Sequence, residues 1–199
     1  MQTAGATVVE GHLDESAVFN DEVTAIFSEF KRDIEKYLRI TPGRHPATLA
    51  ELIAFNQADP IELRSFGQDR FELAERAPSA SDPVVVAARQ RATSRARAII
   101  DEALAAYDLD AVAAPTNGPA WLTTLGQGDA VTGPSSSRLP AVSGYPSITV
   151  PAGLDGELPI GISFIGTRFA DGDLLSLAFS FERATHARRA PKLLASIGG

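Results

Sequence analysis

The sequence predicts an α/β protein in which a mixed sheet is flanked by helices. Apolar residues recur with helical period through most of the chain up to residue 107, and short β-branched apolar runs follow between residues 109 and 166. Because both kinds of element occur in one chain, a layered α/β arrangement buries the apolar faces of both. The 199 residues, 44% of them hydrophobic, suit one large globular domain or two small ones, with a sizeable core.

The chain is predicted to begin with a strand and a long helix. The β-branched run GATVVE, residues 5–10, predicts the strand. The helix is expected to end at TPGRHP, residues 41–46, where two prolines and a glycine break the pattern. Its apolar residues stand at helical spacing and are expected to face the core: Val23, Ile26, Phe27, Phe30, Ile34, Tyr37 and Leu38.

Capping patterns mark the following helices. Thr48 and Glu51 stand at capping-box spacing before a short second helix. The stretch IELRSFGQDRFELAERA predicts a turn and a third helix. Asp82 is expected to cap a fourth helix, which has Pro83 in its first turn and runs to about Tyr107. Residues 16–107 thus form a predicted helical subregion, whose basic RQRATSRAR face is interpreted as solvated surface.

The region 108–170 is predicted to be rich in strands and to form a cleft. LDAVAAPT, residues 109–116, predicts a buried strand that opens into a loop rich in Gly, Pro, Ser and Thr, and α/β proteins often place ligand sites at such strand ends. SITVP and IGISFIG predict two more strands, with a tight turn at Asp155-Gly156 between them. A C-terminal helix is expected over 171–189.

Composition excludes several classes of protein. The chain has no cysteine, so disulfides, zinc thiolates and a cysteine nucleophile are excluded. A net charge of −7 argues against a nucleic-acid partner, and no run reaches the length of a membrane span. No metal-ligand pattern and no nucleotide-binding motif is present, so we expect no metal and no cofactor. The N-terminus lacks a signal-peptide pattern, and we expect a cytoplasmic protein.

Three consecutive serines, Ser135 to Ser137, are candidates for a nucleophile. A serine hydroxyl needs a base to become nucleophilic. The three histidines and three lysines all fall in polar or terminal stretches, and neither G-x-S-x-G nor S-x-x-K is present. We therefore expect these serines to cap or hydrogen-bond the local backbone.

An ordered series of motifs resembles one enzyme family. LDAVAAPTNGPAW, SSSRLPAVSGYPSITVPAG, LPIGISFIG and DGDLLSLAFSFERATHARR are similar to the C-terminal half of amidase-signature hydrolases, and HPATLAELIAFN is similar to their peptide-amidase-like members. The resemblance covers residues 4–192. It implies a sheet with helices on both faces and hydrolysis of carboxamides by a Ser–cis-Ser–Lys triad. The glycine- and serine-rich stretch that carries the triad is missing from this sequence, so no catalytic residue is assigned.

The resemblance leaves residues that would line a substrate cleft. Thr116, Asn117 and Trp121 follow the predicted strand, and an aromatic residue on such a loop often lines a pocket. Trp121 could equally pack the loop down. Phe66 and Gln68, in FGQDRF, are further candidates for substrate binding, although the start of a helix also explains them.

Two functional hypotheses follow. In the first, the chain is the C-terminal portion of an amidohydrolase acting on C–N bonds other than peptide bonds, supplies one wall of the cleft, and is inactive alone. In the second, it is a non-catalytic module that binds a ligand or a partner. The expected partners are a small amide or peptide-amide substrate and either the missing N-terminal half or a second copy of the chain.

Overall fold

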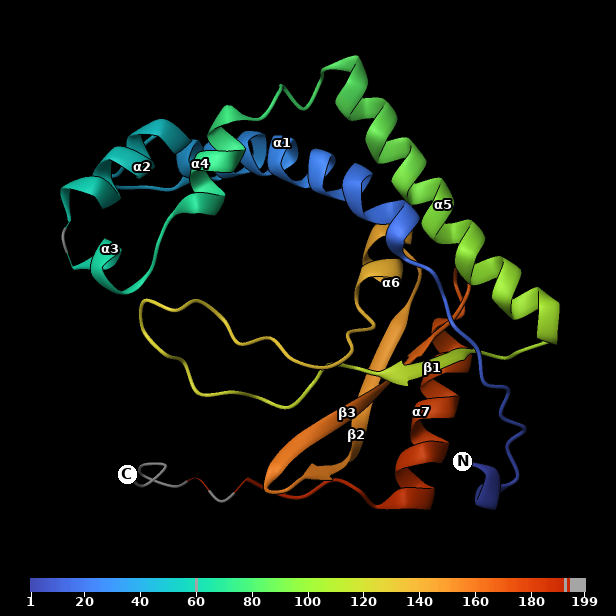
Figure 1. The fold of residues 1–199 in the computed structure, drawn as a ribbon. Helices are drawn as coiled ribbons and strands as arrows, with labels where there is room; N and C mark the ends of the chain where they lie inside the picture. Colours follow the sequence, from blue (N-terminus) through green and yellow to red (C-terminus); the bar gives the residue numbers. More distant parts are fainter. Residues whose placement is uncertain (60, 192, 194–199) are drawn as a thin grey trace.

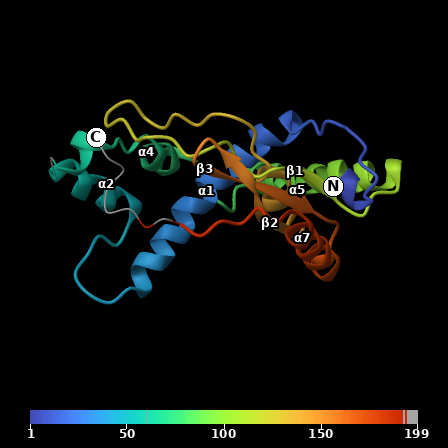
Figure 2. The ribbon, with the colours of Figure 1, turned by 90° about the horizontal axis from the view of Figure 1, so that it is seen from below.

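The computed structural model describes residues 1–59, 61–191 and 193. Lys192, one of the lysines weighed as a base, lies outside the described residues. A helical arm leads away from a small sheet, with α2, α3 and α4 at its far end (Figures 1 and 2). The helices and strands, after a 3-10 turn at Gln2–Ala4, are α1 Ser16–Ile40, α2 Leu49–Ala58, α3 Glu62–Ser65, α4 Asp69–Arg76, α5 Pro83–Tyr107, β1 Val112–Pro115, α6 Arg138–Ser143, β2 Ser147–Asp155, β3 Leu158–Ile165 and α7 Asp171–Thr185.

The predicted starts of α2 and α5 are confirmed by their capping contacts. The hydroxyl of Thr48 accepts a hydrogen bond from the N–H of Glu51 at 3.2 Å, and the Glu51 carboxylate accepts one from Ala47 N–H at 2.7 Å. Asp82 accepts from the N–H of Val84 at 2.8 Å. Both caps satisfy N–H groups that a helix leaves without partners in its first turn.

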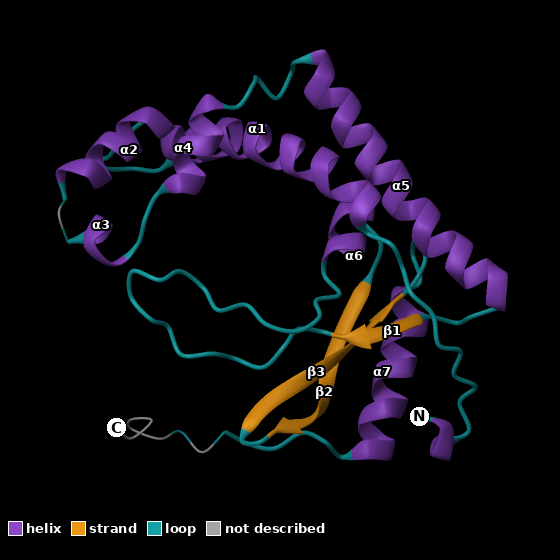
Figure 3. Ribbon diagram, viewed as in Figure 1, coloured by secondary structure: helices purple, strands orange, loops and turns teal. Residues whose placement is uncertain are grey.

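The three strands form one antiparallel sheet in the order β1-β3-β2 (Figure 3). The predicted hairpin is confirmed, because β2 ends at Asp155 and Gly156 turns the chain with a φ of 61°. The α/β class is confirmed as well. A mixed sheet was expected, and the strands that the structure describes pair only in antiparallel fashion because β3 folds back between β2 and β1.

Helices cover both faces of this sheet. Side chains alternate between faces along a strand, so neighbours on β3 enter different cores. Ile165 packs with Leu139 of α6 and Ile100 of α5 in one cluster. Phe164 packs with Leu174 of α7 in the other.

Two sequence-based expectations about strands are wrong. Residues 5–10 form no strand, and Val8 and Val9 are 42% and 43% exposed. A strand needs ladder hydrogen bonds to a neighbour, and no described strand pairs with this segment. The run 109–116 does form a strand, β1, but it is half-exposed rather than buried because β1 lies at an edge of the sheet.

The burial of α1 also differs from expectation. Val18 and Ala25 are buried, whereas Ile26 and Tyr37 are 55% and 59% exposed. Leu38 is buried as expected, and Val23, Phe27 and Ile34 are half-buried. The buried stripe of α1 therefore matches the expected one only in part, because the main tertiary partner of α1 is α5. At the other end of the chain, α7 ends at Thr185 rather than 189, because His186 turns left-handed with a φ of 46°.

Candidate functional site

Thr116 lies at the root of the long loop, directly after β1. Its N–H donates to the carbonyl of Gly161 at 2.9 Å, which continues the pairing of β1 with β3. Its hydroxyl lies 2.9 Å from that of Ser163, which lies 3.0 Å from that of Thr149. A Cβ on Gly161 would come within 2.9 Å of the Thr116 hydroxyl, so the glycine leaves room for this group. Three hydroxyls thus meet on one face of the sheet.

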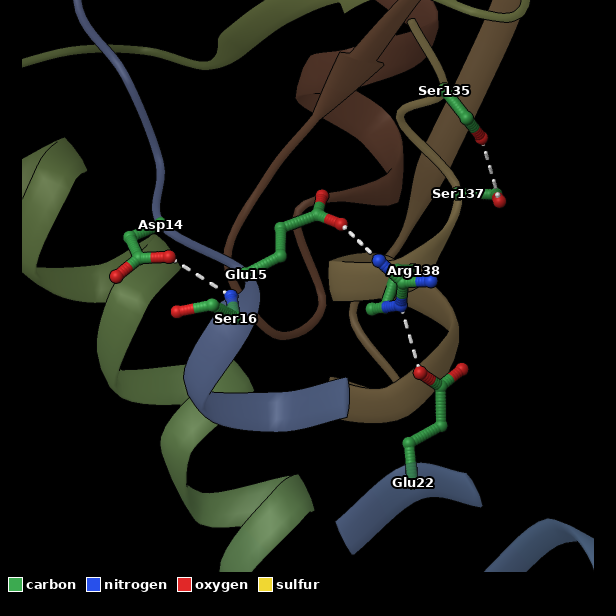
Figure 4. Close-up of polar contacts among 7 residues, drawn as sticks. All are labelled: Asp14, Glu15, Ser16, Glu22, Ser135, Ser137 and Arg138. Atoms are coloured by element: carbon green, nitrogen blue, oxygen red, sulfur yellow. Dashed lines mark hydrogen bonds and ion pairs between the residues drawn. The ribbon is translucent and has the colours of Figure 1, made fainter. Parts of the chain in front are cut away.

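Ser136 closes the loop against Thr116. Its N–H donates to the Thr116 carbonyl at 3.2 Å, and its side chain is 7% exposed. The hydroxyls of Ser135 and Ser137 lie 3.2 Å apart, both exposed (Figure 4). Among the described residues no histidine or lysine makes a hydrogen bond to these serines. Ser136 therefore bonds the local backbone, as expected for this stretch.

The two arms of the loop touch at a narrow neck. A Cβ on Gly118 would lie 1.8 Å from the Thr132 carbonyl oxygen, so only glycine fits there. Beyond this neck the loop projects apolar side chains outward: Trp121 is 41% exposed, Leu125 62% and Val131 69%. Asn117 is also exposed.

Arg138 fastens the other end of the loop to α1. Its Nε donates to Glu22 at 2.8 Å and its Nη1 donates to Glu15 at 3.0 Å (Figure 4). Its guanidinium carbon also lies 5.1 Å from the centre of the Phe19 ring. Because the Arg138 side chain is 36% exposed, solvent screens these pairs, and each contributes at most about 1 kcal/mol. Together they fix where the loop enters α6.

Phe66 and Gln68 lie on the helical arm. The Gln68 side-chain amide donates to the Ile53 carbonyl at 3.4 Å and accepts from Asn56 at 3.3 Å, which ties the start of α4 to α2. Phe66 ends α3 and is 57% exposed. Within the described chain, no hydrogen bond or ion pair joins these two residues to Thr116, Asn117 or Trp121. The candidate residues therefore form two groups on different elements.

The sequence did not reveal a cluster of polar side chains around Asp101. Its carboxylate accepts from the Tyr145 hydroxyl at 2.7 Å and from the Thr167 hydroxyl at 2.9 Å. The hydrogen bond to Asp101, followed by burial, raises the pKa of Tyr145. No local pattern could reveal these contacts, since 44 and 66 residues separate the partners.

One groove runs along the free edge of β1. It measures about 690 Å³ and is lined by β1, by the N-terminal segment around His12 and by the C-terminal part of α5. The described residues contain no group of three or more His, Cys, Asp or Glu that could hold a metal ion. They also contain no helix with the length and apolar character needed to cross a membrane.

Comparison with known proteins gives one consistent result. The amidase family profile matches residues 1–175. A probable amidase of Arabidopsis thaliana is 34% identical over 177 residues, which is 87% of this chain. The crystal structure of PAM12A superposes with a TM-score of 0.87 at 41% identity, and that of the native peptide amidase of Stenotrophomonas maltophilia with 0.80 at 39%, each over 96% of this chain.

These relatives are much longer than this chain. It spans 31% of the Arabidopsis protein, and 39% and 38% of the two crystallised chains.

Proposed function

The chain belongs to the amidase family, and from that premise we propose that it is one portion of an amidohydrolase that cleaves C–N bonds of carboxamides other than peptide bonds. In this proposal it supplies sheet scaffold and one wall of the cleft. The catalytic groups come from outside these 199 residues, and the chain is inactive alone.

One observation carries the proposal. The chain is 39% identical to a peptide amidase over nearly its whole length but spans only 38% of that enzyme. Within the described part of the chain, no histidine or lysine hydrogen-bonds the three consecutive serines: Ser136 bonds the backbone, while Ser135 and Ser137 contact each other. The similarity to an enzyme named for peptide amides favours a peptide-amide or other small amide as the substrate.

The proposed wall begins at Thr116. The cluster of three hydroxyls from Thr116, Ser163 and Thr149 offers hydrogen-bond donors and acceptors that suit a carboxamide. Asn117 and Trp121 follow on the loop and would contact the rest of the substrate. Phe66 and Gln68 are proposed as a more distant part of the same wall.

The free edge of β1 is the proposed contact with the rest of the enzyme. Thr116 N–H points to β3, so alternation along the strand turns Ala113 N–H toward the free edge. An unpaired edge readily accepts another strand, and the groove of about 690 Å³ lies beside it. A second copy of the chain could occupy this edge in the absence of the remaining portion.

Complementation tests the proposal. Ammonia release from N-acetylphenylalaninamide is measured with this chain alone, and with this chain co-expressed with the part of the Stenotrophomonas maltophilia peptide amidase that it does not match. We expect hydrolysis only from the pair. Hydrolysis by the chain alone would disprove the assignment of the chemistry to residues outside it. Binding without hydrolysis in either case would favour the non-catalytic module.

A matched pair of variants tests the edge. Ala113→Pro removes the outward N–H of β1, and Pro115 shows that this register of the strand tolerates proline. It is expected to abolish complementation. Ala120→Pro, at an exposed loop position, is expected to preserve it.

A further inference from the structure

We propose that a groove on α1, between α4 and α6, binds the apolar side chain of an uncharged amide. This inference rests on the proposed function and assigns the part of the substrate that lies beside the scissile group. α1 forms one wall of the groove, and α4 and α6 stand near its two ends (Figure 1).

The groove has the size and lining of a site for a small apolar group. It measures about 470 Å³, within the range typical of ligand pockets. The apolar residues that line it stand at helical spacing on α1, with one more on α4: Phe19, Val23, Ile26, Phe27, Phe30 and Phe71. Three of them remain at least one-third exposed: Phe19 at 48%, Ile26 at 55% and Phe30 at 36%.

This stripe is distinct from the one that holds α1 in the fold. Val18 and Ala25 are buried, and Val18 packs in the cluster that includes α5. A helix with apolar residues on two sides can bury both only with two partners, and α5 covers one side. The side that carries Ile26 therefore remains available in this chain.

Contacts at both ends hold the groove open in a fixed shape. At one end the rings of Phe30 and Phe71 stack with centroids 5.7 Å apart. At the other end Arg138 is held by Glu15 and Glu22 and lies over Phe19. Walls that are already positioned lower the entropy that binding would otherwise lose.

Charge at the Arg138 end selects against an anion. One guanidinium is shared by two carboxylates, which leaves this end with a net negative charge. A ligand carboxylate would meet repulsion there and find Nε and Nη1 of Arg138 already engaged. Arg70, the other cation that lines the groove, is paired with Asp69 at 3.6 Å and does not offset this charge. A neutral amide is favoured over the corresponding acid, which is also the distinction between substrate and product in amide hydrolysis.

A short stretch of backbone links the groove to the wall that begins at Thr116. Arg138 is two residues from Ser136, whose N–H donates to the Thr116 carbonyl at 3.2 Å. In this proposal the cluster of hydroxyls at Thr116 contacts the polar amide, and the groove binds the attached side chain. The two sites thus bind different parts of the same substrate.

Binding of three probes tests the inference without requiring turnover. N-acetylphenylalaninamide, N-acetylphenylalanine and N-acetylglycinamide are titrated into the ¹⁵N-labelled chain, and amide shifts in α1 are followed. We expect saturable shifts around Ile26, with the aromatic amide binding about tenfold more tightly than either other probe. No saturable shift in α1, or tighter binding of the acid, would overturn the inference.

Two substitutions on one helix sharpen the test. Ile26→Trp fills the groove and should weaken binding of the aromatic amide about tenfold or more. Ile40→Trp makes the same change at a position of α1 that is 75% exposed and should leave binding unchanged. Equal effects of the two would contradict the proposed location.

Glu22→Gln tests the role of charge. It should reduce the ratio of affinities for the aromatic amide and the corresponding acid, and an unchanged ratio would refute that role.

Parallel hydrolysis assays on the complemented enzyme separate this inference from the proposed function. If hydrolysis is restored and Ile26→Trp lowers kcat/KM for the phenylalanine amide but not for the glycine amide, the proposed function and the groove inference are both supported. Equal loss for both amides would mean that the missing portion packs in the groove, which overturns the inference alone. Probe binding without hydrolysis would defeat the proposed function and leave the groove assignment intact.

Discussion

The Tyr145 hydroxyl donates a hydrogen bond of 2.7 Å to the carboxylate of Asp101, although 44 residues separate the two. Asp101 lies on α5, and Tyr145 lies between α6 and β2. The other oxygen of the same carboxylate accepts from Thr167, between β3 and α7. One carboxylate thus joins α5 to the segment that leads into β2 and to the segment that follows β3.

Tyr145→Phe tests this junction. The change removes a hydrogen bond to a charged acceptor and is expected to lower the free energy of unfolding by about 1–2 kcal/mol. Tyr107→Phe is the matched control, since Tyr107 is 59% exposed at the end of α5. Chemical denaturation measures both variants. Equal effects would show that the Asp101 contact contributes nothing to stability.

The His45 ring should titrate above its ordinary pKa. Both ring nitrogens face carbonyl oxygens, of Pro46 and Thr41, each at 2.7 Å, and only the protonated ring donates to both. These hydrogen bonds raise the pKa of His45. Because the folded-state pKa is the higher one, the contribution to stability is complete below about pH 6.5 and is lost as the pH rises through the folded value.

An NMR titration of the His45 ring protons measures this shift directly. We expect a midpoint above about 6.5 in the folded chain and no such elevation in urea. His45→Gln should remove the corresponding pH dependence of the melting temperature. A folded midpoint at or below the unfolded one would contradict the hydrogen bonds seen here.

Gly118→Ala should open the neck of the long loop. The added Cβ would lie 1.8 Å from the Thr132 carbonyl oxygen, a separation that backbone atoms relieve only by moving apart. We expect a local cost of about 1–3 kcal/mol, seen as faster proteolysis and hydrogen exchange within the loop. Gly11→Ala is the control, because a Cβ there would meet no atom within 4 Å. Similar proteolysis of both variants would show that the neck is not closed in solution.

Leu174 and Leu175 form an adjacent pair on α7 with opposite environments. Leu174 is 2% exposed and packs with Phe164, whereas Leu175 is 60% exposed. Leu174→Ala is expected to cost about 2–5 kcal/mol of unfolding free energy. Leu175→Ala should change stability by no more than about 0.5 kcal/mol. Thermal denaturation of both variants checks the assignment of this face of α7, and a reversed order would refute it.

Features that depend on residues close together in the sequence were predictable. Helix periodicity, the Thr48–Glu51 capping box and the turn at Gly156 depend on residues only a few positions apart, and the structure forms all of them. Residues 5–10 show the limit of such reasoning. Their β-branched sequence favours a strand, but strand formation requires a partner that the described chain does not supply.

The candidate site divides in the same way. Thr116 was predicted from its place after a strand, and it does lie at the end of β1 beside Gly161. Arg138 was not predicted, because its partners Glu15 and Glu22 are more than a hundred residues away. Ion pairs at that separation leave no periodic trace in a sequence.

The sequence by itself determined that this chain is α/β, where α1 ends, where α2 begins, where α5 begins and ends, and that the chain resembles amidases. Tertiary structure decided which stripe of α1 is buried, that β1 lies at an edge, and that Arg138 and Asp101 join distant segments. The physical reason is the range of the forces involved. Capping and turn formation act between neighbours, whereas burial and ion pairing depend on the element that packs against each residue.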